Sequence, residues 1–213
     1  MGRSERTARR AAASGSGPTH DAPGRNPGAS GGFALFGEVL LTGVLVTAAG
    51  LPVVTLPAAL AAGSRHLRRF ARAEGSSLRA FGADLRAALP GGLPVGAVAA
   101  AIVAVLALDV VLAVSGALPG GGIVGAIGWA LLAALGGAVL AVSGAWTPET
   151  GWRPAVRALP ASVARDVPGA LYLVAAACFV GLAAWMLVPL VVPALGCAAL
   201  ASVAVPERPR RSG

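Results

Sequence analysis

Charged residues are scarce in this sequence, at 12% of 213 residues, and aromatic residues make up only 5%. Hydrophobic residues make up 56%, so too few polar side chains are present to cover the surface of a soluble globular protein. The mean hydropathy of +0.76 is typical of integral membrane proteins. The composition therefore excludes a soluble globular fold and makes the lipid bilayer the first expected partner.

Lysine is absent, and cysteine and histidine occur only twice each. Cys178 and Cys197 both lie in apolar segments, which excludes a disulfide framework and a cysteine metal site. His20 and His66 have no partner at the spacing of a zinc site or a catalytic triad. The glycine-rich stretch GALPGGGIVGAIG lacks the lysine of a phosphate-binding loop. We therefore expect no cofactor, no metal and no enzymatic activity.

Long apolar runs are abundant and predict an all-α, polytopic transmembrane bundle of about six helices. Runs near 20 residues match a hydrocarbon core of roughly 30 Å at about 1.5 Å per residue. The runs are 33–50, a short one at 56–63, then 93–114, 123–142, 169–188 and 190–205.

The arginines alternate along the chain with the apolar runs. Segments 1–32, 63–92, 146–168 and 206–213 contain all 17 of them, and the intervening links near 50–55, 116–122 and 188–190 contain none. The positive-inside rule then predicts a multi-pass protein of the cell membrane with both termini in the cytoplasm. Since the arginines are not gathered on a soluble module beside aromatic residues, no nucleic-acid partner is expected.

Three parts are expected along the chain. Residues 1–32 are rich in Ser, Gly, Pro and Arg and predict a disordered cytoplasmic tail. Residues 33–205 form the transmembrane helical domain, which includes a cytoplasmic amphipathic segment at 75–90. Residues 206–213 form a basic cytoplasmic tail.

The amphipathic segment predicts a helix that lies on the cytoplasmic membrane surface. Its apolar residues recur at helical spacing: Leu78, Phe81, Leu85 and Leu89. Arg79 and Arg86 share the other face, Ser76 or Ser77 can cap the helix start, and Pro90 is expected to end it. The helix is either a plain connection or a docking site for a cytoplasmic partner.

The stretch GLPVVTLPAAL interrupts the first apolar region. Pro52 and Pro57 disfavour a continuous helix, and Thr55 is placed to cap a second helix, so the first two helices are expected to be broken at a Pro/Thr turn. Arg65 follows Pro57 by only eight residues. The turn therefore lies either at the outer interface, with the arginines snorkelling inward, or below it, where it would line a cavity.

Only two charged residues, Glu38 and Asp109, lie within the apolar helices. Ionisable groups inside a membrane are costly and often functional, although each of these two lies near a helix end. Their expected depths are opposite, so the two carboxylates are not expected to meet.

The first half of the chain resembles the YesL-like family of small bacterial membrane proteins. The matching parts are LPVVTLPAALAA, the basic stretch after it, and SLRAFGADLRAALP, so the resemblance covers residues 33–115. Phe81 and Leu85 fit the family's F-x-x-N-hydrophobic pattern, with Asp84 in place of the usual asparagine. The aromatic and asparagine residues frequent in the family's first helix are absent from LLTGVLVTAAG. Family members often occur beside carbohydrate ABC-transporter genes, which implies an accessory role in sugar uptake.

Two functions follow from this sequence as hypotheses. The first is a non-catalytic accessory or regulatory membrane protein that associates with transporter subunits. The second is a small transporter or channel that works as a homo-oligomer, with Glu38, Asp109 and the Pro/Thr break along its path.

Overall fold

A computed structural model describes residues 32–72, 74, 76–116 and 120–208. Within these residues it contains seven α-helices and two short 3-10 turns, and no strand. The elements are α2 (Gly32–Gly50), η1 (Val53–Thr55), α3 (Leu56–Ala71), α4 (Leu78–Val114), α5 (Gly121–Ala145), α6 (Trp152–Arg165), α7 (Val167–Met186), η2 (Val188–Leu190) and α8 (Val191–Glu207). The two predicted tails lie outside the described residues, except for Gly32 and residues 206–208.

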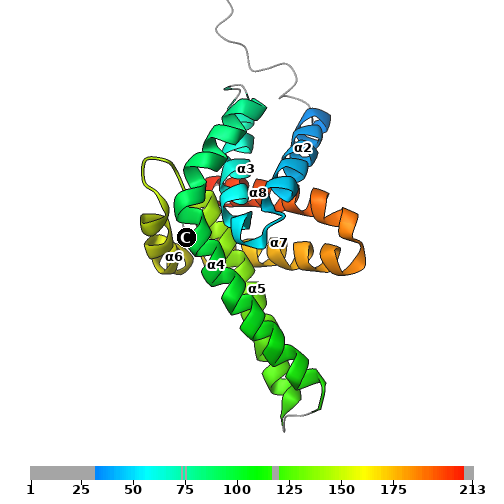
Figure 1. Ribbon diagram of the computed structural model, residues 1–213. Helices are drawn as coiled ribbons and strands as arrows, with labels where there is room; N and C mark the ends of the chain where they lie inside the picture. Colours follow the sequence, from blue (N-terminus) through cyan, green and yellow to red (C-terminus); the bar gives the residue numbers. More distant parts are fainter. Residues whose placement is uncertain (1–31, 73, 75, 117–119, 209–213) are drawn as a thin grey trace, which may run out of the picture.

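Five segments are long and apolar enough to cross a membrane: α2, α4, α5, α7 and the stretch Val188–Glu207. The predicted all-α, polytopic helical bundle is confirmed. Figure 1 shows α4 running along much of the molecule with α5 beside it, so that the far ends of α4 and α5 project beyond the other helices. The α2–α3 hairpin covers the first part of α4, and α6 lies beside its middle (Figure 1).

The short helix α3 is the buried centre of the bundle. It packs against α2, α4, α5 and α8, and ten of its 16 residues are buried. Its buried face consists mostly of alanine, glycine and serine, whose small side chains let the neighbouring helices approach closely. Of the six helices predicted to span the membrane, α3 is not among the five that are long and apolar enough, because it has 16 residues, and the other helices enclose it.

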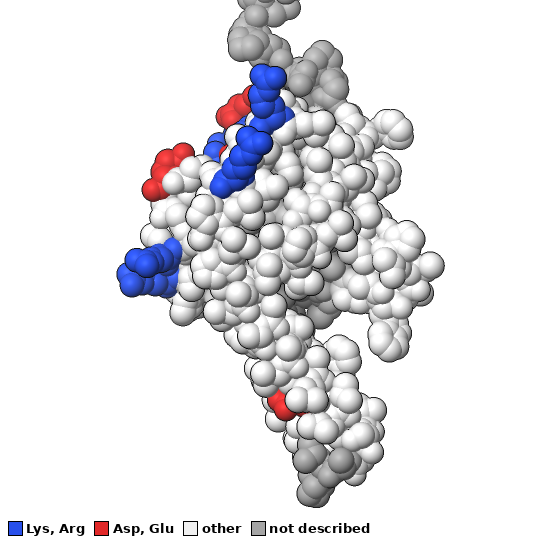
Figure 2. All heavy atoms as spheres, in the orientation of Figure 1, with Lys and Arg blue, Asp and Glu red and all other residues white. Residues whose placement is uncertain are grey.

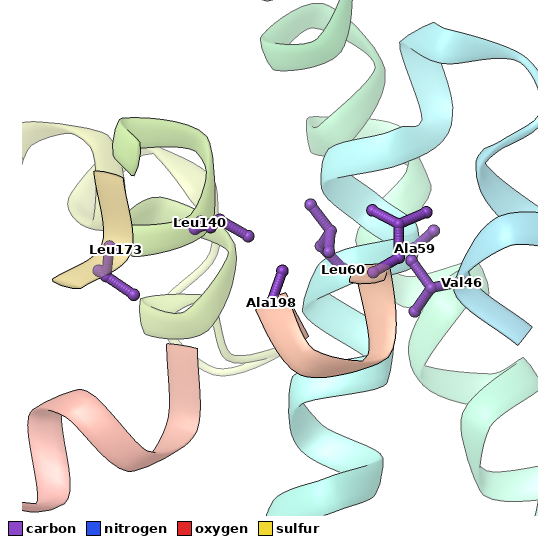
Figure 3. Packing of buried hydrophobic residues seen from close by; sticks show 7 residues of the cluster. Val46, Ala59, Leu60, Leu140, Leu173 and Ala198 are labelled. Atoms are coloured by element: carbon purple, nitrogen blue, oxygen red, sulfur yellow. The ribbon is translucent and has the colours of Figure 1, made fainter. Parts of the chain in front are cut away.

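The main apolar core joins both halves of the chain through α3 and α8. Figure 3 shows Ala59 and Leu60 of α3 beside Val46 of α2, with Ala198 of α8 close to them. Leu140 of α5 and Leu173 of α7 belong to the same cluster. Burial of these side chains holds the α2–α3 hairpin, α5, α7 and α8 together.

The Pro/Thr turn lies midway along α4 and lines a cavity, which favours the second of its two expected positions, below the outer interface. The predicted break between the first two helices is confirmed, since α2 ends at Gly50 and α3 begins at Leu56. However, Val54 in the turn contacts α4 at Gly96, which is 18 residues before the end of α4. At about 1.5 Å per residue, α4 continues roughly 27 Å beyond the turn. The turn lies at this point of α4 because α3 runs antiparallel to α4 and is too short to reach further along it.

The amphipathic segment is the first part of α4 and not a separate surface helix. Ser77 caps α4 as predicted, by accepting a hydrogen bond of 3.2 Å from the Ala80 backbone N–H. The expected end at Pro90 is wrong, because α4 continues through Pro90 and Pro94. Proline is tolerated there because α4 is held in place by its packing against α3 and α5. The Trp152 indole packs on Gly91 and its Nε1–H donates to the Ala88 carbonyl at 2.9 Å.

Candidate functional site

The ends of five helices meet in a charged cluster around the last turns of α3. The cluster consists of Glu38, Arg65, His66, Arg68, Arg69, Ser76, Asp84 and Glu207, together with the Gly144 carbonyl. Figure 2 shows basic and acidic atoms gathered at this end of the molecule and over α6, while the visible face of the α4–α5 hairpin has almost no charge. The charged groups thus connect the ends of helices that are far apart in the sequence.

Asp84 is the centre of the cluster. Its side chain is only 8% exposed and lies between two arginines of α3. One carboxylate oxygen accepts from the Arg65 Nε–H at 3.2 Å, and the other accepts from Arg69 Nη2. The position of Asp84 follows from helix periodicity, since Phe81, Asp84 and Ala88 share the buried face of α4. The ion pairs link α3 to the start of α4.

Glu38 and His66 form the second part of the cluster. The His66 ring is 1% exposed, and its Nε2 lies 2.7 Å from Glu38 Oε1, although the two atoms are not aligned for a hydrogen bond. Ser76 donates to the same carboxylate oxygen at 2.8 Å. The Phe81 ring meets the His66 ring edge to face at 6.3 Å between centroids. These contacts join α2, α3 and the start of α4.

Two arginines attach the last helix to the rest of the bundle. Arg68 donates to the Gly144 carbonyl at 3.2 Å, and its Nε lies 3.6 Å from Glu207 at the end of α8. Arg208 pairs with Asp166, which also caps α7 by accepting from the Gly169 N–H at 3.0 Å. The ends of α5, α7 and α8 are therefore held at the same side of the molecule as the start of α2.

The predicted site residues fall into three places. Glu38, Phe81 and Asp84 belong to or contact the charged cluster. Pro52, Thr55 and Pro57 lie at the α2–α3 turn. Asp109 is exposed on α4 and enters no ion pair within the described residues. The seven residues therefore do not form one site, and Glu38 and Asp109 are far apart on the fold, as expected.

Thr55 holds the turn in a way that differs from the expected helix cap. It occupies the N-cap position of α3 but makes no capping hydrogen bond. Its hydroxyl lies 2.6 Å from the Ala49 carbonyl oxygen and 2.7 Å from that of Pro52, so it donates back toward the end of α2. Pro57, in the first turn of α3, lines an apolar cavity of about 190 Å³ together with Gly96, Leu140 and other residues of α4, α5, α7 and α8. The turn therefore lies against a cavity that is lined by apolar residues.

Sequence reasoning did not identify the residues that pair with the two carboxylates, which are Arg65, His66 and Arg69. The basic stretch was interpreted only as a topology signal, because a charge run gives no indication of which carboxylate it meets. One signal was available: Arg65 and Arg69 are four residues apart and so share a face of α3. The helix α6 was also missed, although Trp152, Ala155 and Leu159 have helical spacing.

The cluster is suited to holding helices together more than to chemistry. Opposite charges in it are paired, and no group of three His, Cys, Asp or Glu side chains that could hold a metal ion occurs within the described residues. Cys178 and Cys197 are free thiols, and both are exposed on the surface of the bundle. What the arrangement provides is a fixed, charged end on an otherwise apolar helical bundle.

Comparison of the chain with protein-family models, with curated proteins and with solved structures found no match.

Proposed function

We propose that this protein is a non-catalytic accessory or regulatory protein of the cell membrane that docks on the permease subunits of a carbohydrate ABC-transport system. In this proposal both termini and the charged cluster face the cytoplasm, in accordance with the positive-inside rule. The sugar-transport context rests on the resemblance to the YesL-like family. The proposed docking surface is the exposed face of the α4–α5 hairpin.

Asp109 on the exposed face of that hairpin is the observation that supports a protein partner most. Large apolar side chains of the same hairpin are also exposed: Val98, Val105, Leu108 and Val111 on α4, and Ile123, Ile127 and Trp129 on α5. Apolar residues alone would suit lipid, but a carboxylate within an apolar helix favours a polar partner. A basic or hydrogen-bonding group of a second membrane protein would satisfy it.

The alternative, a small oligomeric transporter or channel, requires a polar path. Glu38 is engaged by His66 and Ser76, the Pro/Thr turn faces an apolar cavity, and Asp109 lies on the outer face of α4. In one copy of the chain, these three features therefore do not lie along a common path. Only an assembly in which several copies pack around Asp109 would favour this function.

A site-specific photo-crosslinker tests the proposed docking. Val105 lies four residues before Asp109, so a benzoylphenylalanine there would face the same partner. In cells that also produce the permease subunits of a carbohydrate ABC transporter, we expect an adduct between this chain and a permease subunit, and a severalfold weaker adduct when Asp109→Asn is added. A crosslinker at Val44, which is exposed on α2, is the matched control and should give no such adduct.

The other outcomes of this experiment decide between the hypotheses. An adduct of two copies of this chain would favour the oligomeric transporter. Adducts with lipid alone at Val105 would contradict a protein partner at this hairpin.

A further inference from the structure

A second, larger hollow lies between α4, α5 and α6, away from the charged cluster. It is a groove of about 860 Å³, which is within the usual range of small-molecule sites. Its length is lined by apolar side chains of α4 and α5, among them Val95, Val98, Ile102, Ala138 and Val142. Arg153 and Arg157 of α6 line the same groove. One cavity therefore combines a long apolar part with a basic edge.

The two arginines are free to bind an anion. They are four residues apart and share a face of α6, where Figure 2 shows a basic patch. Both are exposed, and neither enters an ion pair within the described part of the chain. The arginines at the end of α3 differ in this respect, since Arg65, Arg68 and Arg69 are each paired with a carboxylate. The positive charge of Arg153 and Arg157 is therefore available to bind a ligand.

Two tryptophans fix the wall of the groove between its apolar and basic parts. The Trp146 and Trp152 rings lie 5.9 Å apart between centroids, and Trp152 is anchored to the Ala88 carbonyl. Tryptophan is enriched where the hydrocarbon core meets the lipid head groups. This arrangement matches the order of parts in a phospholipid, with an apolar chain, an interfacial region and a phosphate.

We infer that the groove binds one anionic phospholipid of the bilayer, with its phosphate on Arg153 and Arg157 and an acyl chain between α4 and α5. Guanidinium groups pair with phosphate oxygens through two parallel hydrogen bonds. A free phosphate ion would use the arginines but leave the apolar groove empty, so a lipid fits the whole site better. Glu149 precedes α6, and hydrogen bonds from its own backbone and from Thr147 lower its pKa, but it does not line the groove.

Fluorescence quenching by brominated lipids tests this inference on the full-length protein in liposomes. The exposed Trp129 and Trp185 are first replaced by phenylalanine, so that only Trp146 and Trp152 report. Phosphatidylglycerol with brominated acyl chains should quench them at lower mole fraction than brominated phosphatidylcholine. In Arg153→Gln/Arg157→Gln this preference should fall, by about fivefold for each arginine.

Two further variants separate a lipid site from general attraction to an anionic surface. Arg79→Gln/Arg165→Gln removes the same charge from arginines that do not line the groove, and it should keep the preference. Ala138→Phe fills the apolar part and should weaken quenching by both lipids.

Four results would overturn the inference. Equal quenching by both lipids in the parent protein would exclude headgroup selection. An equal loss of preference in both arginine pairs would indicate non-specific attraction. Loss of the preference in millimolar inorganic phosphate would assign the arginines to a free anion. No quenching by either lipid would mean that a protein segment, such as a second copy of the chain, fills the groove.

Discussion

Replacing Asp84 with alanine is expected to destabilise the protein by about 3 kcal/mol. The change leaves Arg65 and Arg69 side by side without the carboxylate that neutralises them. Removing one partner of a fully buried pair costs about 3–5 kcal/mol, and the lower end applies because the two arginines are 23% and 21% exposed. Reversible unfolding in mixed micelles with increasing sodium dodecyl sulfate measures the difference in unfolding free energy.

Asp109→Ala is the matched control for this prediction. It removes the same group from an exposed position of the same helix, so the change in stability is expected to stay within about 0.5 kcal/mol. Asp84→Asn should fall between the two, because its amide oxygen still accepts a hydrogen bond from one arginine. Equal stabilities of Asp84→Ala and Asp109→Ala would show that the cluster does not hold α3 against α4.

The crossing of α2 and α8 is expected to be the second most sensitive place. Gly43 and Gly196 lie where the two helices touch, and a Cβ at either would overlap a backbone carbonyl, that of Val192 or that of Val39. Since backbone atoms cannot rotate away, the helices must separate, and overpacking of this kind costs about 1–3 kcal/mol. Gly43→Ala and Gly196→Ala should each lose that much in the same unfolding measurement.

Gly181→Ala provides the comparison, because α7 has space for a Cβ at this position. No atom lies within 4 Å of a Cβ built at Gly181, so only the better helix propensity of alanine acts, which favours folding by up to about 1 kcal/mol. If Gly43→Ala proved as stable as Gly181→Ala, α2 and α8 would not pack as closely as described.

Local sequence signals predicted the apolar helices and the break between the first two, but not α6. Apolar runs and the prolines at 52 and 57 act on neighbouring residues, so they can be interpreted without the rest of the chain. The same holds for Ser77, whose capping bond spans three residues. The continuity of α4 through Pro90 could not be predicted, because it depends on the packing of α4 against α3 and α5, which a local pattern does not reveal.

The candidate site residues were also predicted only in part, since their partners depend on distant parts of the chain. Glu38 was identified because a carboxylate in an apolar helix is unusual, and Asp84 because it stands in place of the asparagine in the YesL-like pattern. Their partners were not, because the pairing of Glu38 with His66 and of Asp84 with Arg65 is fixed by how α2 and α4 are aligned with α3. The position of the turn against Gly96 has the same origin, since it follows from the length of α3.

The central claim is that the charged cluster faces the cytoplasm while the α4–α5 hairpin crosses the membrane. Single-cysteine labelling in intact cells tests it directly, in a Cys178→Ser/Cys197→Ser background that removes both native thiols. Ser115 lies just beyond the last residue of α4, and Ser77 caps its first turn. We expect a membrane-impermeant maleimide to label Ser115→Cys from outside and to label Ser77→Cys only after permeabilisation. Labelling of Ser77→Cys in intact cells would contradict the account.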